Sequence, residues 1–206
     1  MRIATLYCLL VLWGLVMRAD FKRHKNYPVL SEFQIDVIEG TLLGDSHLEL
    51  HKNGRHASYK FEQSIRHVDY VNYICEYLRP FSSEAKSWFV DKSKWGKGVY
   101  ELCGFRTCCH PQFTKIHGRW YSDQIKVVPQ DLELNWRKVS YWFADDGHRK
   151  ESSKKELVLC TESFTETENQ MLSEILLRDL CVKTTLIKNG NNSEGEIGYR
   201  LSLIHI

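Results

Sequence analysis

The chain has 206 residues, enough for one large domain or for two halves of roughly 100 residues each. With 43% apolar residues, it should form a packed core, which argues against wholesale disorder. The net charge is only +2, from 28 basic and 26 acidic residues, and so gives little support for a polyanion partner.

The N-terminal region contains an apolar run of fifteen residues, from Ile3 to Met17. This run is shorter than the roughly 20 residues that a bilayer span needs. It is similar to a signal-peptide core, with Arg2 before it and a poor cleavage site near Ala19. We prefer a leader associated with a membrane, or a remnant of an upstream exon, over secretion, and we assign residues 1–29 to it.

Local signals predict the elements that follow. Ser31 and Gln34 have the spacing of a helix capping box, and Asn53-Gly54 between two alternating runs predicts a hairpin. Helical periodicity and turn residues mark the remaining elements. The first half is expected to hold a helix at 31–43, strands at 47–51 and 57–63, a helix at 66–79, strands at 87–92 and 99–107, and a helix at 111–121.

The second half repeats this order. Asn135 is a plausible N-cap for a helix over 135–147. A strand within 154–163, a helix over 165–180 and two strands within 181–206 follow. Asp45 and Asp146 are 101 residues apart (146 minus 45), each at the end of the first helix of its half. Because two similar halves are related by a pseudo-two-fold axis, these two aspartates are expected to converge.

Both aspartates stand where a helix disfavours them. An acid at a helix C-terminus faces the negative end of the macrodipole, at a cost of roughly 0.3–1 kcal/mol. A divalent cation would compensate, and Mg²⁺ suits one or two carboxylates together with a substrate phosphate. Asp145-Asp146-Gly147 alone is also typical of an ordinary solvent turn.

Two motifs carry a family resemblance. "IEGTLLGDS" (38–46) and "VSYWFADDG" (139–147) resemble the LAGLIDADG homing endonucleases of the single-chain, organellar, intron-encoded type, and the likeness runs from about residue 30 to the end. It implies an α+β fold of two pseudo-symmetric αββαββ(α) repeats, 30–130 and 131–206, with curved antiparallel DNA-binding sheets. The second repeat lacks the family's final helix and second basic residue, so we expect a truncated chain with weakened activity.

The resemblance also implies the site. The last acid of each motif, Asp45 and Asp146, is expected to bind metal and to be catalytic, with Asp145 beside them as a further metal-associated acid. Lys126 in "IKVVP" is the expected basic catalytic residue, the alternative being a solvated loop lysine.

The supporting positions follow from the same motifs. Gly40 and Gly44 would allow the two motif helices to approach closely, and Tyr141 and Trp142 would fill the space between them. The pairs Glu62-Gln63 and Thr161-Glu162, after the hairpin signals, are expected at the floor of the site.

DNA is expected to bind to the strands, as a β-ribbon that reads the major groove. For each residue the alternative is a solvated polar sheet face. The expected DNA-facing residues are His47, Glu49, His51, Lys52, Arg55, Ser58, Lys60, Lys92, Lys94, Lys97 and Arg106 in the first half, and His148, Arg149, Lys150, Lys154, Lys155, Lys183, Lys188 and Arg200 in the second.

The function implied is a Mg²⁺-dependent homing endonuclease that makes double-strand breaks in an intron-lacking allele. Two alternatives stay open: an RNA maturase that assists splicing of its own group I intron, and a degenerate nucleic-acid-binding protein without catalysis. We expect a monomer that acts on double-stranded DNA without a stable protein partner, in an organelle, with mitochondrion favoured over chloroplast.

The cysteines suggest no additional site. Their number, seven, is odd, which argues against a disulfide scaffold. Cys108-Cys109-His110 lacks the paired C-x2-C spacing of zinc sites. We therefore expect free thiols of a reducing compartment.

Overall fold

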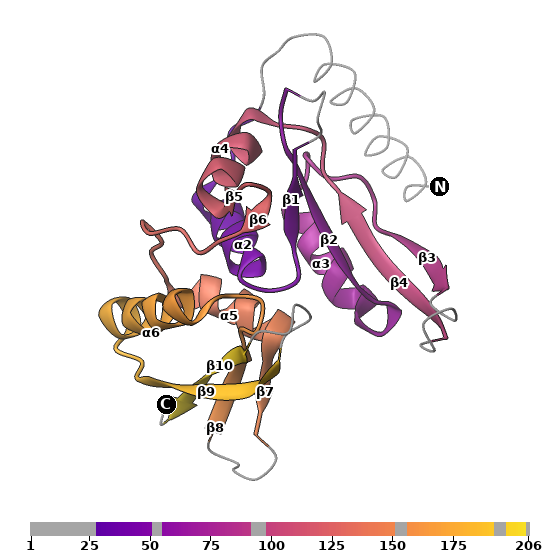
Figure 1. Cartoon of the computed structure of the whole chain (residues 1–206). Coiled ribbons are helices and arrows are strands. Elements are labelled where there is room, and N and C mark those ends of the chain that lie inside the picture. The colour runs from indigo at the N-terminus through magenta and orange to yellow at the C-terminus, as the bar shows by residue number, and fades with distance from the viewer. Residues whose placement is uncertain (1–27, 51–54, 92–97, 151–155, 192–196, 205–206) are drawn as a thin grey trace, which may run out of the picture.

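The structure is a computed structural model that describes residues 28–50, 55–91, 98–150, 156–191 and 197–204 (Figure 1). Of the expected leader, only residues 28 and 29 fall within these ranges. No helix in the described ranges combines the length and the apolar character needed to cross a membrane.

The first lobe is a four-stranded antiparallel sheet with helices packed on it. Its elements are α2 (Glu32–Leu42), β1 (His47–Glu49), β2 (Ser58–Ser64), the short 3-10 helix η1 (Ile65–His67), α3 (Val68–Tyr77), β3 (Lys86–Asp91), β4 (Val99–Arg106) and α4 (Pro111–Trp120). The strand order is β1-β2-β4-β3. The predicted capping box is present: the Gln34 backbone N–H donates to Ser31 Oγ, and the Ser31 N–H donates to the Gln34 side chain.

The second lobe repeats the architecture. A two-residue hairpin, β5 (Tyr121–Ser122) and β6 (Ile125–Lys126), lies between the lobes in the chain. The second lobe contains α5 (Trp136–Asp146), β7 (Gly147–Arg149), β8 (Glu156–Cys160), α6 (Glu166–Leu180), β9 (Thr184–Asn191) and β10 (Ile197–Ile204). Its strand order, β7-β8-β10-β9, matches that of the first sheet. The expected α+β fold with repeated antiparallel sheets is confirmed.

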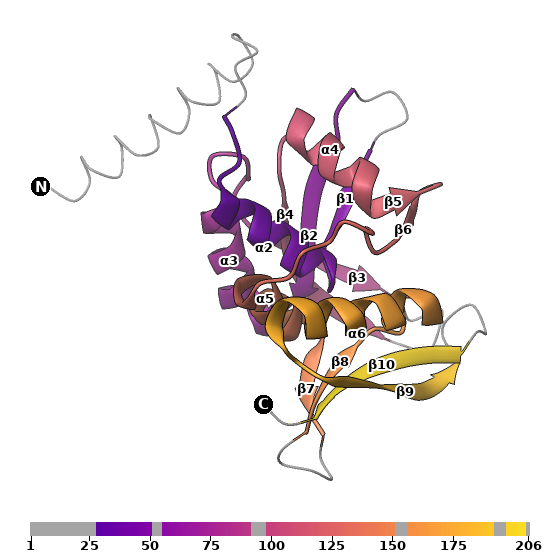
Figure 2. The same ribbon diagram turned by 90° about the vertical axis from the view of Figure 1, so that its left-hand side faces the viewer.

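The lobes meet through α2 and α5, which lie side by side between the two sheets (Figures 1 and 2). The core continues through both lobes and includes fully buried Trp120 of α4 and Trp142 of α5. Burial of large apolar side chains is the main stabilising contribution, at roughly 25 cal/mol per Å². This core fixes the directions of the two helices and therefore the places where they end.

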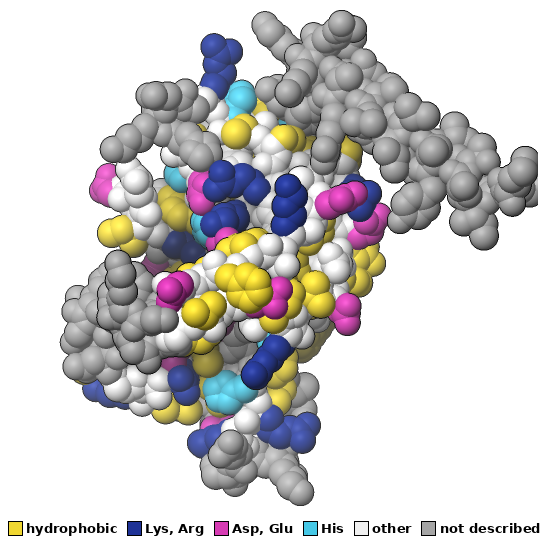
Figure 3. Space-filling model, turned by 90° about the vertical axis from the view of Figure 1, so that its right-hand side faces the viewer, with side chains coloured by type: hydrophobic (Ala, Val, Ile, Leu, Met, Phe, Trp, Pro, Cys, Tyr) yellow, Lys and Arg dark blue, Asp and Glu magenta, His cyan; other side chains and the backbone are white. Residues whose placement is uncertain are grey.

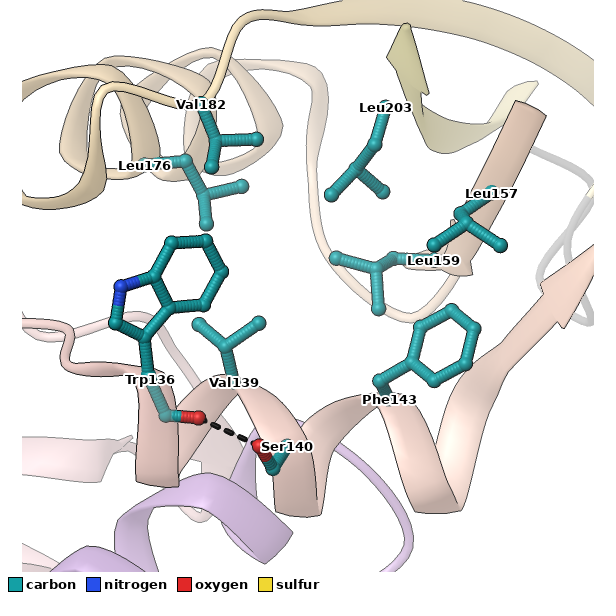
Figure 4. Close-up of a pocket in the computed structure, with 9 residues that line it drawn as sticks. All are labelled: Trp136, Val139, Ser140, Phe143, Leu157, Leu159, Leu176, Val182 and Leu203. Atoms are coloured by element: carbon teal, nitrogen blue, oxygen red, sulfur yellow. Dashed lines mark hydrogen bonds between the residues drawn. The ribbon is translucent and has the colours of Figure 1, made fainter. Parts of the chain in front are cut away.

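An apolar cavity of about 260 Å³ lies in the second lobe, between α5, α6 and the sheet (Figure 4). Val139 and Phe143 of α5 and Leu159 of β8 are among its lining residues. Its polar side chain, Ser140, donates its hydroxyl to the Trp136 carbonyl at 2.7 Å. The lining contains no titratable group, so this cavity is not a candidate for the catalytic centre.

The six cysteines of the described ranges are free. Cys108 is half-buried, and burial raises the pKa of its thiol to about 11. Cys109 beside it is exposed.

His110 caps the start of α4 in its neutral form. Its Nδ1 accepts the Gln112 backbone N–H at 3.1 Å, so Nε2 carries the proton and donates to the Pro28 carbonyl at 2.9 Å. Burial lowers the pKa of His110, and the nearby His56 lowers it further, while the bond to Pro28 opposes both.

His110 should therefore make stability depend on pH. Because the folded pKa lies below the unfolded value of about 6.5, the folded state resists protonation, and stability is lost as pH falls below about 6.5. Between pH 7.5 and 5, the free energy of unfolding from urea denaturation should fall more steeply in the wild type than in His110→Asn, which keeps an N-cap oxygen but does not titrate. Parallel pH profiles would contradict this role.

Candidate active site at the meeting of two helix ends

The C-terminal ends of α2 and α5 converge. The Asp45 backbone N–H donates to Asp145 Oδ2 at 3.3 Å, across 100 residues of sequence. Gln63, at the end of β2, donates its side-chain amide to Asp45 Oδ2 at 2.6 Å. Tyr70 of α3 donates its hydroxyl to Asp145 Oδ1 at 2.9 Å. The acids of both motifs thus share one polar cluster.

Two glycines, Gly40 of α2 and Gly44 just after the helix, allow this close approach. A Cβ on Gly40 would lie 2.6 Å from the Lys138 carbonyl oxygen and 2.9 Å from Tyr141 Cβ. A Cβ on Gly44 would overlap the Asp145 side chain, with Oδ2 at 2.7 Å. Tyr141 therefore occupies the expected place, but the residue packed on Gly44 is Asp145 rather than Trp142.

Ion pairs that involve buried acidic side chains connect α2 to α5, one to three helical turns on the N-terminal side of Asp45 and Asp146. Glu39, 2% exposed, accepts from Lys138 Nζ at 2.7 Å and from Arg119 Nη1 at 2.5 Å. Asp36 accepts from Arg137 at 2.7 Å and from Asn135 at 3.0 Å. Paired in this way, the charges avoid the penalty of an isolated buried ion and hold α5 in a defined position against α2.

Lys126 lies at the negative end of α2. Asp123 and Gln124 of the β5–β6 turn both have positive φ, 49° and 68°, as a two-residue type I′ hairpin requires. The hairpin carries Lys126 Nζ to the carbonyls of Leu42, Gly44 and Ser46, at 3.0, 3.0 and 2.9 Å. All three ammonium protons have acceptors, so Lys126 is not a solvated loop lysine.

The acids carry more negative charge than their surroundings balance. Burial raises the pKa of Asp145 to about 8, and the charges of Asp45 and Asp146 add to the shift, while the hydrogen bond from Tyr70 opposes it. Burial raises the pKa of Asp146 to about 7, with Asp45 and Glu162 acting in the same direction and Lys126 against it.

The pKa values of Asp45 and Lys126 are also shifted. Asp45 is solvent-exposed, but neighbouring atoms desolvate it enough to raise its pKa, against Gln63, Lys126 and His67. Burial lowers the pKa of Lys126, opposed by all three aspartates. Three carboxyl groups beside one lysine therefore resist full ionisation, and a divalent cation that displaced their protons would stabilise the ionised cluster.

The donor set fits a hard divalent cation. Asp45 and Asp146 offer carboxylate oxygens, the ligands that Mg²⁺ prefers. No group of three or more His, Cys, Asp or Glu side chains within the described residues is placed to hold a metal ion by itself. A cation here would therefore need water and substrate oxygens as further ligands. Both Asp145 oxygens accept protein hydrogen bonds, which favours a supporting role for Asp145 beside the two expected ligands over direct metal ligation.

The first sheet places several predicted DNA contacts together on its open face, the face turned away from the core. Paired positions put His47, Lys60 and Arg106 in one row across β1, β2 and β4. Glu49 is ion-paired with Arg106, and its Oε1 lies 3.2 Å from His47 Nε2. Arg55 is exposed ahead of β2. Ser58, expected to contact DNA, is instead buried at 1% exposure, so it presents no hydroxyl to a ligand.

The second sheet divides its predicted contacts between two faces. His148 and Arg200 belong to the open face, where His148 Nδ1 lies 3.5 Å from Cys160 Sγ. Arg149 is paired with Leu157, and Lys188 with Tyr199. Leu157 lines the apolar cavity and the Tyr199 hydroxyl donates to Glu166 of α6, so the register places Arg149 and Lys188 on the helix side. The sequence assignment of these two residues to the DNA face is wrong for this register.

The remaining predicted contacts are peripheral or lie outside the described residues. Lys150 is ion-paired with Glu156 at 2.8 Å, and Lys183 is exposed just before β9. The residues outside the described ranges are His51, Lys52, Lys92, Lys94, Lys97, Lys154 and Lys155. On the face that Figure 3 shows, the Lys and Arg side chains of the described residues are interspersed with acidic and apolar ones.

Two duplicated sheet-bearing lobes, joined by paired helices with carboxylates at their ends, define the class: an internally repeated α+β architecture. The LAGLIDADG DNA endonuclease family matches residues 35–203, and the chain belongs to this family.

Individual relatives agree with this assignment. The chain is 29% identical over 174 residues to "Probable intron-encoded endonuclease 1" of Wickerhamomyces canadensis, with 81% of this chain and 71% of that protein covered. It is 28% identical over 170 residues to "Cytochrome b mRNA maturase bI2" of Debaryomyces hansenii, with 80% and 63% covered. The fold resembles that of the homing endonuclease I-WcaI bound to its DNA recognition sequence, with a TM-score of 0.76 and 23% identity, covering 87% of this chain and 79% of that one.

Proposed function

We propose that this protein is a site-specific homing endonuclease that uses Mg²⁺ to hydrolyse both strands of double-stranded DNA at an allele lacking its intron. The observation that carries the proposal is the convergence of the two motif ends, in which the Asp45 backbone bonds the Asp145 carboxylate. Family membership supports the reaction class. We further propose that the protein acts as a monomer, because both motif helices come from one chain.

Each residue of the cluster has a defined task. Asp45 and Asp146 hold the cation, which when bound stabilises charge on the phosphate and lowers the pKa of water. Gln63 orients Asp45, while Tyr70 fixes Asp145 between the helix ends. Lys126 places a positive charge beside all three acids and stabilises the turn that presents Asp45. The sheets orient the duplex through His47, Lys60, Arg106 and Arg200.

A maturase function is the second candidate. The similarity to a protein named cytochrome b mRNA maturase favours it, and an intron RNA would then be a partner. A nucleic-acid-binding protein that keeps the fold without cutting DNA is the third candidate. We place the protein in an organelle, and in the mitochondrion before the chloroplast, on the strength of the intron-encoded and cytochrome b relatives.

A plasmid assay tests the endonuclease. The full chain is incubated with Mg²⁺ and a library of plasmids that carry candidate intron insertion junctions, and the expected product is a single linear species from one junction. Addition of EDTA is the matched control and should abolish cutting. Salt-sensitive binding without cutting at any junction would contradict the proposal and favour the non-catalytic alternatives; promotion of intron splicing by the same protein would then select the maturase.

A further inference from the structure

Arg200 lies in line with the acid of the second motif. Asp146 immediately precedes Gly147, which is paired with Leu159 of β8. The next residue of β8, Cys160, is paired with Arg200 of β10. Neighbouring strands are about 4.8 Å apart, so the Arg200 backbone is about two strand spacings from the end of α5. An arginine side chain and a phosphate can together span that distance.

Arg200 and the acidic side chains lie around the Cys160 side chain. Burial is the main cause that raises the pKa of the Cys160 thiol; the charges of Glu162, Asp146 and Asp45 raise it further, and Arg200 lowers it. All four charged groups therefore act on a single side chain on the open face of the second sheet. Arg200 is consequently close to the acids as well as to the DNA-facing surface.

The guanidinium of Arg200 is held so that its outer edge stays available. Its Nε donates to Glu162 Oε1, and Glu162 also accepts from Asn189 at 2.8 Å. Neither terminal nitrogen of Arg200 donates to a described residue. A guanidinium fixed through Nε, with both terminal nitrogens free, has the geometry that binds a phosphate through two parallel hydrogen bonds.

The first lobe provides its positive charge differently. His47 and His148 stand two residues after their aspartates and lead the rows His47–Lys60–Arg106 and His148–Val158–Ser202. The first row ends at Arg106 of β4 and the second at Ser202 of β10. The residues two positions before these, Gly104 and Arg200, therefore occupy matching places in the two sheets. At Gly104 a Cβ would overlap the Phe61 carbonyl oxygen and lie 2.9 Å from the Trp88 ring, so no side chain fits there.

Lys126 provides the corresponding charge in the first lobe, through its bonds to the end of α2. Among the described residues, no lysine donates to the carbonyls at the end of α5. Within the described residues, Lys126 thus places a positive charge beside the acids from the first lobe, and Arg200 places one from the second.

We propose that Arg200 is a catalytic residue of the second lobe, where its two terminal nitrogens contact the scissile phosphate of one DNA strand. The inference rests on the proposed endonuclease function. Because the lobes are related by a pseudo-two-fold axis, as the strands of the duplex are, each lobe serves one strand. Loss of Arg200 should then affect the two strands unequally.

Strand-resolved cleavage tests the assignment. A linear duplex with the recognition site, end-labelled on one strand or the other, is cut under single-turnover conditions with Mg²⁺, and a supercoiled plasmid with the same site is cut in parallel. Arg200→Gln should slow cleavage of one strand by about 100-fold, the loss typical when a donor to developing charge is removed, and nicked circles should accumulate. Arg200→Lys, which keeps the charge without the bidentate geometry, should restore part of the rate on that strand.

Matched controls separate this role from sheet stability and from simple DNA affinity. Arg200→Gln leaves the Glu162 carboxylate without its arginine partner, and the double variant Arg200→Gln/Glu162→Gln removes that carboxylate as well. The double variant should still cut one strand more slowly than the other. Arg106→Gln breaks the Arg106–Glu49 pair of the first sheet, two residues beyond Gly104, the position that matches Arg200, and should weaken DNA binding while slowing both strands equally. Equal slowing of both strands by Arg200→Gln, or weaker binding alone, would overturn the inference. A wild-type chain that cuts no DNA would overturn the proposed function and the inference with it.

Discussion

Replacing Asp45 or Asp146 by asparagine should reduce cleavage of both DNA strands by at least about 100- to 1000-fold. Each substitution keeps the size of the side chain but removes the charge that a divalent cation requires, and electrostatic stabilisation of this kind is a large contribution to catalysis. Affinity for DNA should stay within a few-fold or rise, because one repelling carboxylate is lost. Single-turnover rates and filter-binding affinities in Mg²⁺ provide the measurement.

Glu174→Gln is the matched control, since Glu174 is an exposed acid on α6 away from the helix ends. It should cleave at the wild-type rate. If Asp45→Asn or Asp146→Asn kept more than a tenth of the wild-type rate, that acid would not be a catalytic ligand.

Gly40→Ala should be the most destabilising small substitution at the interface between the lobes. The new methyl group would lie 2.6 Å from the Lys138 carbonyl oxygen, a backbone atom that cannot rotate away. Relief requires α2 and α5 to move apart, which strains the Glu39–Lys138 pair, so we expect a loss of about 2–4 kcal/mol in the free energy of unfolding. Cleavage should also fall, because the helix ends separate.

Gly118→Ala in α4 provides the comparison. A Cβ on Gly118 meets no atom within 4 Å, so the change should be neutral or stabilise by about 0.5–1 kcal/mol through helix propensity. Urea denaturation of both variants measures the difference. Equal stabilities would show that α2 and α5 are not in close contact at Gly40.

Local sequence patterns, which involve residues only a few positions apart, were sufficient to predict most helices and strands. The capping box of Ser31 and Gln34 and the N-cap of Asn135 are local hydrogen bonds, encoded by residues three apart. The convergence of Asp45 with the second motif is a contact between residues far apart in sequence. It could be predicted because the order of elements is repeated in the two halves. β7 was not predicted, because its three residues, Gly147–Arg149, are too few and too polar to show alternation.

The roles of interface residues could not be predicted in the same way. Glu39 and Lys138 are buried charges, and their pairing depends on which faces of two helices meet. Nor could local sequence reveal that Asp145 would pack on Gly44. Motif position identified Asp146 as a ligand candidate, but only the hydrogen bonds of Tyr70 and the Asp45 backbone distinguish the task of Asp145.

Errors on the DNA-binding face have a geometric cause. Lys188 is paired with Tyr199, whose hydroxyl donates to Glu166 of α6, so Lys188 lies on the helix side of the sheet. Its charge suggested the DNA face, and only the strand pairing shows which face it occupies. Ser58 was misjudged for a different reason, since its small hydroxyl side chain lies at the buried start of β2, where polarity is a poor guide to exposure.

Binding of Mn²⁺ as a spectroscopic substitute for Mg²⁺ tests the shared cation site most directly. Electron paramagnetic resonance titrations of the full chain bound to its DNA site should show that Asp45→Asn and Asp146→Asn each weaken Mn²⁺ binding at least about tenfold, while Glu174→Gln leaves it unchanged. Mn²⁺ affinity that depends on only one of the two aspartates, or on neither, would contradict a site shared between the two helix ends.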